Sequence, residues 1–532
     1  MGKTRVEKAL DILQQEIVLW RAEGTGEVFA DLPGMRFYPV GDPRFYQWGL
    51  RLVWERSGDG TVLRRDEWQT VVDNLRARVS DTAFPVFVRV GGVPGAVFWD
   101  LGEGLPVVRI TGNGWDLVDK PEALPVRFRR SAYMHPLPVP DSDAKPEDVF
   151  LIRELLNLSG EEEEKVKESL LLLVGWLLGT LNPFGSYPVL LLKGEKGSGK
   201  TTAARILKGL VDPHQVLSMA PSRDMKDLMV AAYWSHLVVM DNVSVFSQEF
   251  ADALCRMATG EALYLRKLYT DYSEEVVVYR RPLVITSVVD PMTQPDLIDR
   301  ALSVELYRVP DTDRKPEEDL YARLTELRPR IMGALAHLVS HALKETTEPQ
   351  FLPRMADFAR FVWRGLKALN LGDAFLSAYE KSRGMMELSA VFDDVAMSVL
   401  VAYIQEKGSF SGTAQELLTE LEGFAGYTRQ KPRGWPGSPV ALGHRLARFK
   451  ASMAALGITV NYHRTRDGNI WTLGLGHGQS PYLEGFDRTD SHSNPQAGGV
   501  ALPYGQTHLR EQDDEAVILL PREKGQLRAG LV

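Results

Sequence analysis

The chain has 532 residues, with 44% hydrophobic and 25% charged side chains, which is the balance of an ordinary folded protein with about three or four domains. A single cysteine, Cys255, excludes a disulfide framework, a cysteine-based zinc ribbon and an iron–sulfur cluster. The net charge of −8 means that any contact with nucleic acid needs a local basic surface. The longest uncharged apolar run, Leu170–Gly179, is about half the length of a membrane span, and the N-terminus has no signal-peptide pattern, so we expect a cytoplasmic protein without membrane contact.

Residues 1–140 are expected to form an α+β domain. The segments Pro85–Val90 and Gly95–Gly102 are rich in β-branched and aromatic residues and are bounded by glycine turns, which predicts two strands. Asp100 is a lone carboxylate where a two-metal site would need a pair, so it is interpreted as structural and the domain is assigned no catalytic role. The segment Pro136–Asp148, dense in proline and aspartate, is predicted to be a linker.

The next segment is predicted to be helical and to lead into an α/β domain. Within Val149–Leu181, apolar residues recur at helical spacing and indicate two helices joined at Ser159-Gly160, which form a helical collar over residues 149–187. In the α/β domain, residues 188–312, short apolar runs alternate with amphipathic segments, which is typical of a mostly parallel sheet. The predicted strands are Val189–Leu192, Leu237–Met240 and Pro282–Thr286.

The last folded parts are predicted to be a helical bundle over residues 313–386 and a winged helix over residues 391–475. A winged helix consists of three helices followed by a β-hairpin, and Asp467-Gly468 is a strong two-residue turn signal for that hairpin. The three predicted helices are Val395–Gln405, Thr413–Glu422 and Pro439–Gly457, of which the first two are joined through the segment SFSG. Residues 476–532 are dominated by glycine, serine, proline and charge, and are expected to be a mostly disordered tail.

The predicted winged helix carries a local excess of positive charge. Eight basic residues and one acid lie between Phe424 and Gly474. Clustered basic residues on a recognition helix and wing are typical of duplex DNA binding, although winged helices also act as protein-interaction modules. The candidate DNA contacts are Arg445, Arg448, Lys450, Arg464 and Arg466.

The strongest motif is a glycine-rich loop between a strand and a helix. Residues Gly194–Thr201 (GEKGSGKT) satisfy the pattern G-x-x-x-x-G-K-[ST], and their context separates them from a chance glycine turn. Glycines let main-chain N–H groups point at phosphates, and the helix N-terminus adds a positive dipole. Lys200 is expected to reach the β- and γ-phosphates, and the Thr201 hydroxyl to bind Mg²⁺. The predicted ATP-binding residues are Gly194, Glu195, Lys196, Gly197, Ser198, Gly199, Lys200, Thr201 and Thr202.

Two later strands end in polar residues that would complete this site. Asp241 is predicted to be the second Mg²⁺ ligand, although a strand that ends in an ordinary Asp-Asn turn is the alternative. Asn242 stands where many such enzymes have a glutamate, and since an amide orients water but accepts no proton, the general base stays open. Thr286 is expected to contact the γ-phosphate or the attacking water.

Arg300 follows the third strand in the segment DLIDRAL. A guanidinium inserted into the nucleotide site of the next subunit would stabilise the transferring phosphate and would imply a ring of copies. The alternative is an ordinary surface arginine on a helix.

Five segments follow one another along the chain: GEKGSGKT, LVVMDNVS, MATGEALYLRKLYTD, RPLVITS and DLIDRAL. In this order they resemble the superfamily 3 helicase branch of the AAA+ ATPases, and most closely the primase-helicase proteins of phages, plasmids and integrative elements. The resemblance is specific over Val149–Arg308 and weaker as far as Arg383. It implies an AAA+ ATPase core, a homo-oligomeric, hexameric ring, ATP hydrolysis and translocation on single-stranded DNA. Thr286 stands where many members have a sensor asparagine. The residues that match family motifs are Lys200, Thr201, Asp241 and Arg300.

The same family carries a basic hairpin that faces the central channel. Here the corresponding stretch is Leu263–Tyr279, with Arg266 and Lys267 before a turn at Asp271–Ser273. Basic side chains that line a narrow pore bind phosphates without reading the base sequence, so these two residues are candidate contacts for single-stranded DNA. The alternative is a solvated hairpin with ordinary charges.

These features predict a multidomain α/β protein with a central P-loop ATPase, an N-terminal α+β domain and a C-terminal winged helix. The predicted function is that of an ATP-dependent DNA helicase or translocase in the replication of a mobile element or phage. Two rivals remain open. One is a DNA-binding replication initiator whose ATPase governs assembly without unwinding, and the other is an AAA+ ATPase that remodels proteins through the winged helix.

Overall fold

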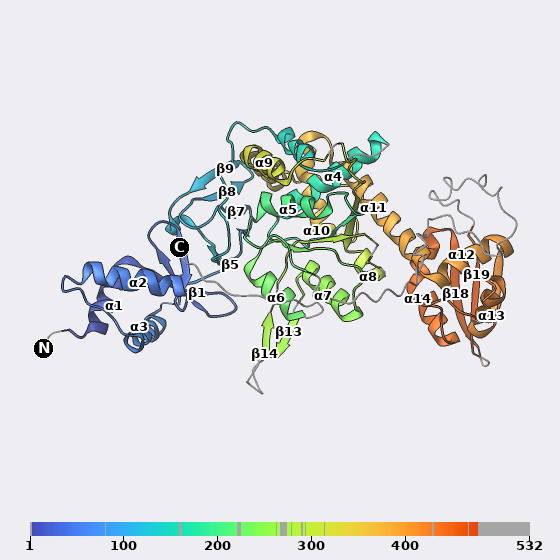
Figure 1. Ribbon diagram of the computed structural model, residues 1–532, viewed down its shortest axis with the longest axis horizontal. Helices are drawn as coiled ribbons and strands as arrows, with labels where there is room; N and C mark the ends of the chain where they lie inside the picture. The colour runs from blue at the N-terminus through green and yellow to red at the C-terminus, as the bar shows by residue number, and fades with distance from the viewer. Residues whose placement is uncertain are drawn as a thin grey trace, which may run out of the picture.

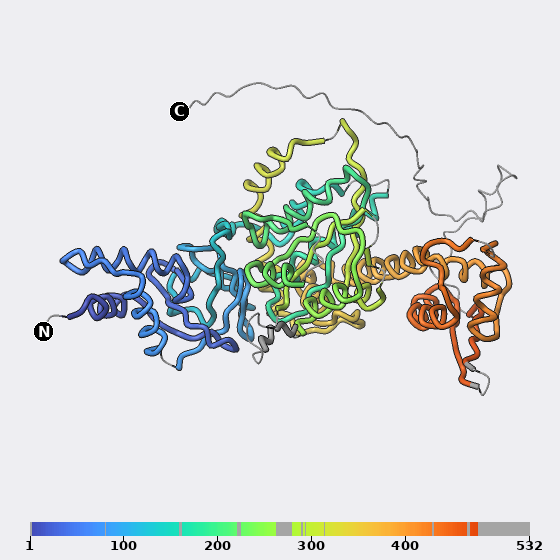
Figure 2. Tube along the Cα trace, turned by 60° about the horizontal axis from the view of Figure 1, so that its bottom comes forward, coloured from blue at the N-terminus to red at the C-terminus, as the bar shows by residue number. Residues whose placement is uncertain are grey.

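The computed structural model describes residues 3–79, 81–158, 162–220, 225–261, 263–266, 274–277, 279–288, 291–292, 294–312, 314–427, 430–465 and 468–476. They form an elongated molecule in which an N-terminal and a C-terminal unit lie at opposite ends of a central α/β core (Figures 1 and 2). Helix α11 (Gly372–Asp393) runs from the core to the C-terminal unit. No helix within the described ranges is long and apolar enough to cross a membrane. The predicted disordered tail lies outside the described residues from residue 477 onward.

The N-terminal unit contains two four-stranded sheets. The first has the order β3-β2-β1-β4 and packs with three helices around a hydrophobic core of its own. The second, of order β6-β7-β8-β9, is antiparallel, and its residues Trp99 and Ile110 belong to the large core that continues through the central part. The elements are α1 (Arg5–Glu16), β1 (Val18–Ala22), β2 (Val28–Leu32), β3 (Arg36–Pro39), α2 (Pro43–Arg56), α3 (Arg65–Arg78), β4 (Ala83–Phe84), β5 (Val86–Phe87), β6 (Val90–Val93), β7 (Ala96–Asp100), β8 (Val107–Thr111), β9 (Gly114–Val118), η1 (Pro121–Ala123) and β10 (Arg127–Phe128).

The two strands predicted in this unit differ in outcome. The prediction of a strand at Gly95–Gly102 is confirmed as β7, and its last residue Asp100 is structural as expected, because its buried carboxylate accepts hydrogen bonds from Arg130 at 2.9 and 2.6 Å. The prediction of one strand over Pro85–Val90 is wrong. Arg89 has φ 61° and separates β5 from β6, since this left-handed conformation breaks the strand.

The core contains a four-stranded sheet in which every strand is parallel to its neighbours. The order is β12-β15-β11-β16, so the strand that comes first along the chain lies inside the sheet. The strands are β11 (Val189–Lys193), β12 (Val238–Met240), β15 (Leu283–Ser287) and β16 (Ala301–Glu305). The three predicted strands are thus confirmed as members of one parallel sheet, whose carboxyl edge collects the residues that follow each strand.

Helices cover the sheet, and a separate antiparallel pair, β13 (Leu263–Arg266) and β14 (Glu274–Val277), projects from the core beside α6 (Figure 1). The remaining core elements are η2 (Pro146–Leu155), α4 (Glu163–Gly179), α5 (Lys200–Val211), α6 (Met225–Trp234), α7 (Gln248–Thr259), α8 (Pro295–Ile298), α9 (Glu317–Lys344), α10 (Ala356–Leu366) and η3 (Lys367–Leu369).

Two predictions about the segment that precedes the core sheet are corrected. The first of the two helices predicted within Val149–Leu181 is the 3-10 helix η2 and not an α-helix. The linker predicted at Pro136–Asp148 is packed against α9, where the N–H of Asp141 donates to the carbonyl oxygen of Pro329 at 2.9 Å. Gly333 permits this approach, because a Cβ there would lie 2.2 Å from the carbonyl oxygen of Asp141.

The C-terminal unit consists of three helices and a three-stranded antiparallel sheet of order β17-β19-β18. The predicted helices and hairpin are present, with β18 and β19 paired as far as Thr465 and Gly468. The segment SFSG, predicted only to join the first two helices, is the strand β17, which pairs with β19. The elements are α12 (Val395–Lys407), β17 (Ser409–Thr413), α13 (Ala414–Phe424), α14 (Pro439–Ala455), β18 (Ile458–Thr465) and β19 (Gly468–Leu475).

Candidate nucleotide site

The glycine-rich loop lies at the carboxyl edge of the sheet, between β11 and the first turn of α5. Gly197 and Gly199 have φ of 86° and 81°, a conformation that favours glycine. Gly194 allows close contact with the segment that follows β16, since a Cβ there would lie 2.1 Å from the carbonyl oxygen of Leu306. The free N–H groups at the start of α5 face this loop and make it suited to an anion.

Lys200 is the first residue of α5, and its ammonium group lies inside the loop. Nζ donates to the carbonyl oxygens of Gly194 and Glu195, at 2.7 Å each, and lies 3.3 Å from Ser198 Oγ. Burial lowers the pKa of Lys200, while the charge of Asp241 acts in the opposite direction. A partly desolvated cation with three donors, held at the centre of a glycine loop, has the chemistry to bind phosphate oxygens.

Asp241 directly follows β12 and is joined to the loop by Thr201. The Thr201 hydroxyl donates to Asp241 Oδ1 at 2.8 Å, so two oxygen ligands from different elements meet at one point. Oxygen ligands of this kind suit Mg²⁺, and the pair therefore fits the cation that accompanies a bound triphosphate.

Thr286 and Asn242 support this carboxylate. The Thr286 hydroxyl donates to Asp241 Oδ1 at 2.5 Å and accepts from the main-chain N–H of Asn242 at 2.8 Å. Asn242 has φ 57°, a strained conformation for a residue other than glycine, while its side chain is exposed. In this geometry Thr286 holds Asp241 in position, and Asn242 contributes through its main chain.

Two residues that the sequence reasoning missed, Asn157 and Glu317, contact the loop and the first turn of α5. Asn157 Nδ2 donates to the carbonyl oxygens of Ser198 at 3.1 Å and Tyr307 at 2.5 Å. Thr202 Oγ1 donates to Glu317 Oε1 at 3.3 Å. Asn157 lies 41 residues before Ser198 and outside any motif, so no signal in the sequence marks it.

Arg300 lies at the other end of the sheet from this loop. Its carbonyl oxygen accepts from the N–H of Val189, the first residue of β11, whereas the glycine loop follows the last residue of that strand. Five residues at about 3.3 Å each separate the two levels by roughly 16 Å. Arg300 therefore does not reach the loop of its own chain.

The two groups of predicted DNA contacts are placed differently. Arg266 ends strand β13, whereas Lys267, the turn Asp271–Ser273 and Arg466 lie outside the described residues. Arg445 is used inside the C-terminal unit, where it donates to Asp394 Oδ1 at 3.0 Å and to the carbonyl oxygen of Gly434 at 2.6 Å.

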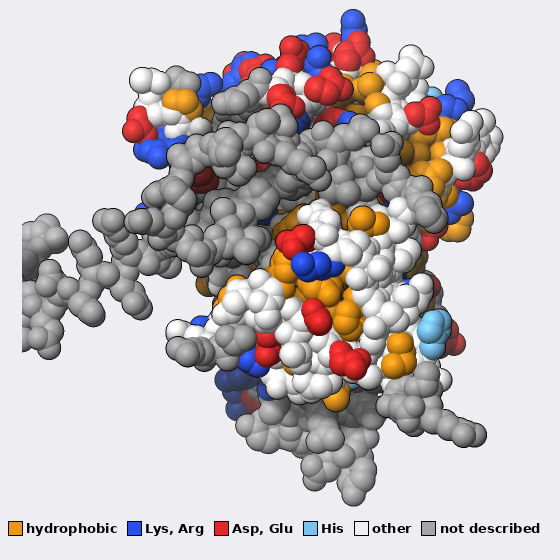
Figure 3. Space-filling model, turned by 90° about the vertical axis from the view of Figure 1, so that its right-hand side faces the viewer, with side chains coloured by type: hydrophobic (Ala, Val, Ile, Leu, Met, Phe, Trp, Pro, Cys, Tyr) orange, Lys and Arg blue, Asp and Glu red, His pale blue; other side chains and the backbone are white. Residues whose placement is uncertain are grey.

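Arg448, Lys450 and Arg464 are exposed, on α14 and β18, and are therefore better placed than Arg445 to meet a partner. Figure 3 views the molecule from the end that holds the C-terminal unit. On the described part of that face, Lys and Arg side chains are scattered among hydrophobic and acidic ones and form no continuous basic surface.

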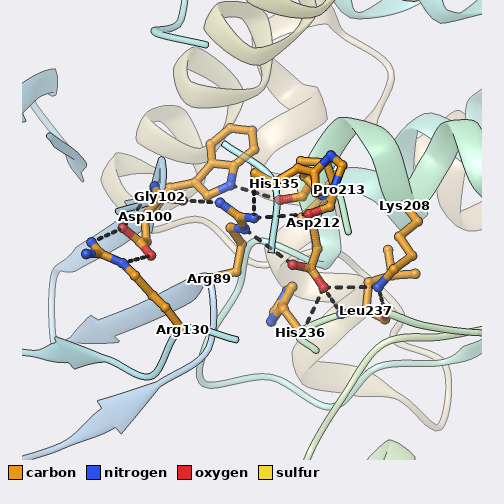
Figure 4. Close-up of polar contacts among 12 residues, drawn as sticks. Arg89, Asp100, Gly102, Arg130, His135, Lys208, Asp212, Pro213, His236 and Leu237 are labelled. Atoms are coloured by element: carbon orange, nitrogen blue, oxygen red, sulfur yellow. Dashed lines mark hydrogen bonds and ion pairs between the residues drawn. The ribbon is translucent and has the colours of Figure 1, made fainter. Parts of the chain in front are cut away.

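A buried polar cluster joins the N-terminal unit to the far end of α5. Arg89, whose side chain is 0% exposed, donates from Nε to Asp212 Oδ1 at 3.3 Å and from Nη2 to the carbonyl oxygen of His135 at 2.7 Å. The other carboxylate oxygen of Asp212 accepts from Lys208 at 3.2 Å and from the N–H of His236 at 2.9 Å (Figure 4). The helix that begins at the glycine loop is thus anchored at its end to the N-terminal unit.

His236 in this cluster predicts a dependence of stability on pH. Its burial lowers the pKa to about 4 from the usual 6.5, so between these values the unfolded chain binds a proton that the folded chain excludes. Stability therefore decreases as the pH is lowered, and between pH 7 and pH 5 the contribution of His236 alone should reduce the free energy of unfolding by about 2 kcal/mol, measured by urea unfolding. His236→Gln keeps an N–H donor for the Thr180 carbonyl, which lies 2.8 Å from Nε2, and should show a smaller dependence. An equal slope in both proteins would contradict this prediction.

Comparisons with solved structures find chains of low sequence identity. Two solved structures with similar chains are an apo structure of the NrS-1 C terminal region (14% identity, TM-score 0.40, 90% of this chain and 100% of that chain) and SCCmec type IV Cch, described as an active helicase (12% identity, TM-score 0.40, 81% and 89%). TM-scores below 0.5 do not establish a common fold. No curated protein matches the chain.

Two family matches cover most of the core and the C-terminal unit. Residues 152–386 match the family described as actinomycete integrative conjugative element replication protein, and residues 395–480 match the C-terminal domain of the same family. Through these two matches, which together cover more than half of its 532 residues, the chain belongs to the replication protein family of actinomycete integrative conjugative elements.

Proposed function

We propose that this replication protein is an ATP-dependent DNA helicase or translocase of the superfamily 3 AAA+ type, which works as a hexameric ring. The observation that carries the proposal is the meeting of Thr201 and Asp241 at 2.8 Å beside the buried Lys200, at the carboxyl edge of a parallel sheet. This is where an α/β sheet binds its ligand, and the three side chains are those needed to hold a triphosphate and Mg²⁺.

In this proposal the residues of the site have different roles in the transfer of the phosphoryl group to water. Lys200 and the N–H groups of the loop bind the phosphates, while Thr286 holds Asp241 in place. Mg²⁺ bound by Thr201 and Asp241 would neutralise charge that develops between the β- and γ-phosphates. Arg300, which cannot reach its own loop, would act on the nucleotide of the next copy, and this requirement supports a ring. The Asn242 amide accepts no proton, so the base that activates water is a different group.

The DNA contacts in this proposal belong to two places. The hairpin of β13 and β14, with Arg266 at the end of β13 and Lys267 next in the sequence, would follow single-stranded DNA in the channel. The C-terminal unit has the order of helices and strands of a winged helix and would hold duplex DNA through Arg448, Lys450 and Arg464. A contribution from Arg466, which lies between β18 and β19 in the sequence, belongs to the same proposal.

Hydrolysis assays with DNA test the proposal against its rivals. We expect single-stranded DNA to raise the ATPase rate of the full chain by roughly tenfold, and the chain to separate a forked duplex only with ATP and Mg²⁺. Stimulation by DNA without strand separation would favour the initiator. An ATPase rate that DNA does not change would favour the ATPase that remodels proteins. A chain that neither binds nor hydrolyses ATP would refute the proposal.

A further inference from the structure

A second arginine lies beside Arg300 at the amino edge of the sheet. Arg300 Nη1 is 3.3 Å from Asp296 Oδ1, and Arg354 Nη2 is 3.5 Å from the same oxygen. Arg354 also contacts Asp299 Oδ2 at 2.8 Å. The two guanidinium groups, 54 residues apart in the chain, therefore share one carboxylate and lie next to each other.

Neither arginine is placed to act on the nucleotide site of its own chain. Both are bound to Asp296, the second residue of α8, and α8 lies on the side of the core that faces the C-terminal unit, away from α5 (Figure 1). The distance of roughly 16 Å derived above for Arg300 thus applies to the pair. A phosphate that meets Arg354 has to belong to another copy.

Arg354 is the more available of the two. Its side chain is 44% exposed, compared with 15% for Arg300. Arg300 is also held by the main chain, because Nη1 donates to the carbonyl oxygen of Asp296 at 2.8 Å, whereas the contacts given above for Arg354 are to carboxylates.

The ion pair of Arg354 with Asp296 is weak enough to be exchanged. Asp296 is 73% exposed, and ion pairs in such surroundings contribute little to stability. A triphosphate carries several negative charges. Two oxygens of one phosphate can accept two parallel hydrogen bonds from a guanidinium group, which a lysine cannot provide. An incoming phosphate can therefore replace the Asp296 carboxylate at Nη2 without a large cost, while Nη1 keeps its contact with the less exposed Asp299.

The geometry points to Arg354 as a second arginine that each copy presents, together with Arg300, to the nucleotide bound by the next copy. This inference rests on the proposed function, because an arginine acts in this way only if copies of the chain share nucleotide sites. It adds to that function a residue outside the segment in which the family resemblance is specific.

Mixing experiments with full-length variants test this assignment. Arg354→Ala should lower the ATPase rate at least tenfold, and Arg354→Lys should restore only a part, since a lysine lacks the fork. The Arg354→Ala protein keeps an intact loop, and the Lys200→Ala protein keeps both arginines. An equimolar mixture of the two should regain activity well above the mean of the separate proteins, which a merely structural role of Arg354 would not produce.

Arg360 provides a matched control on the same stretch of chain. It lies on α10, is 39% exposed and pairs with Asp357 at 2.7 Å, so Arg360→Ala removes a comparable ion pair away from α8 and should stay within twofold of wild type. The inference fails if Arg354→Ala also stays within twofold, or if it is inactive and gains nothing on mixing while Arg300→Ala does gain. A wild-type chain without ATPase activity, or an Arg300→Ala protein that behaves as wild type, would instead count against the proposed function.

Discussion

Replacing Lys200 with alanine should abolish ATP hydrolysis while leaving the chain folded. The ammonium group lies inside the glycine loop, 2.7 Å from two of its carbonyl oxygens, whereas Lys196 of the same loop is exposed. Without it, the charge that develops on the transferring phosphate loses a buried cation, and the expected fall in kcat is on the order of 10²–10³-fold or more. Release of phosphate, measured with single-stranded DNA present, gives the rate.

A lysine on α4 serves as the control for this substitution. Lys167 is exposed and pairs with Glu163 at 3.2 Å, so Lys167→Ala removes the same charge from the surface and should leave hydrolysis unchanged. Thermal unfolding of the Lys200→Ala protein should match that of wild type within a few degrees. If that protein still turned over ATP within tenfold of wild type, the assignment of the glycine loop would be refuted.

The order of elements around the loop could be predicted because each signal is local. The glycines of Gly194–Thr201, the apolar run before them and the helical spacing after them lie within about 20 residues of one another. The sequence places Asp241 and Thr286 after apolar runs, and parallel strands bring such residues to the same edge of the sheet. Their hydrogen bond could not be predicted, because it depends on β12 and β15 being neighbours.

Where the structure differs from the prediction, the reason is a contact between residues that are far apart in the sequence. Of the residues of SFSG only Phe410 is a strong strand former, and the segment forms β17 because β19, about 60 residues later, offers it a partner. Counting charges identified the C-terminal unit as basic, yet it could not show that Arg445 is bound to Asp394. A guanidinium engaged inside the fold and one exposed to a partner look the same in a sequence.

The buried contact of Arg89 with Asp212 is another that the sequence did not predict, since 123 residues separate the two. Charged residues are seldom fully buried unless they are paired. Nothing in the sequence around Arg89 or around Asp212 indicates that the two form a pair. Its position between the N-terminal sheet and the end of α5 means that the two parts fold against each other.

Replacing Arg89 with methionine should therefore destabilise the chain strongly. The substitution keeps most of the side-chain volume but leaves Asp212 with one cation fewer, and it leaves the carbonyl oxygens of Asp100 and His135 without the N–H groups that now bind them. Removing one partner of a buried ion pair costs about 3–5 kcal/mol. Urea unfolding measures this loss. Arg109→Met is the matched control, because Arg109 lies on β8, in the same sheet as the strand β6 that follows Arg89, pairs with Asp116 at 2.6 Å and is 42% exposed.

The exposed pair of Arg109 should contribute less than about 1 kcal/mol, so the two methionine variants are expected to differ by at least 2 kcal/mol. The double variant of Arg89→Met and Asp212→Asn should lose less than the sum of the two single variants, because the second change removes the charge that the first leaves poorly compensated. Additive losses, or equal losses in the Arg89→Met and Arg109→Met proteins, would show that Arg89 does not join the N-terminal unit to the helix of the nucleotide loop.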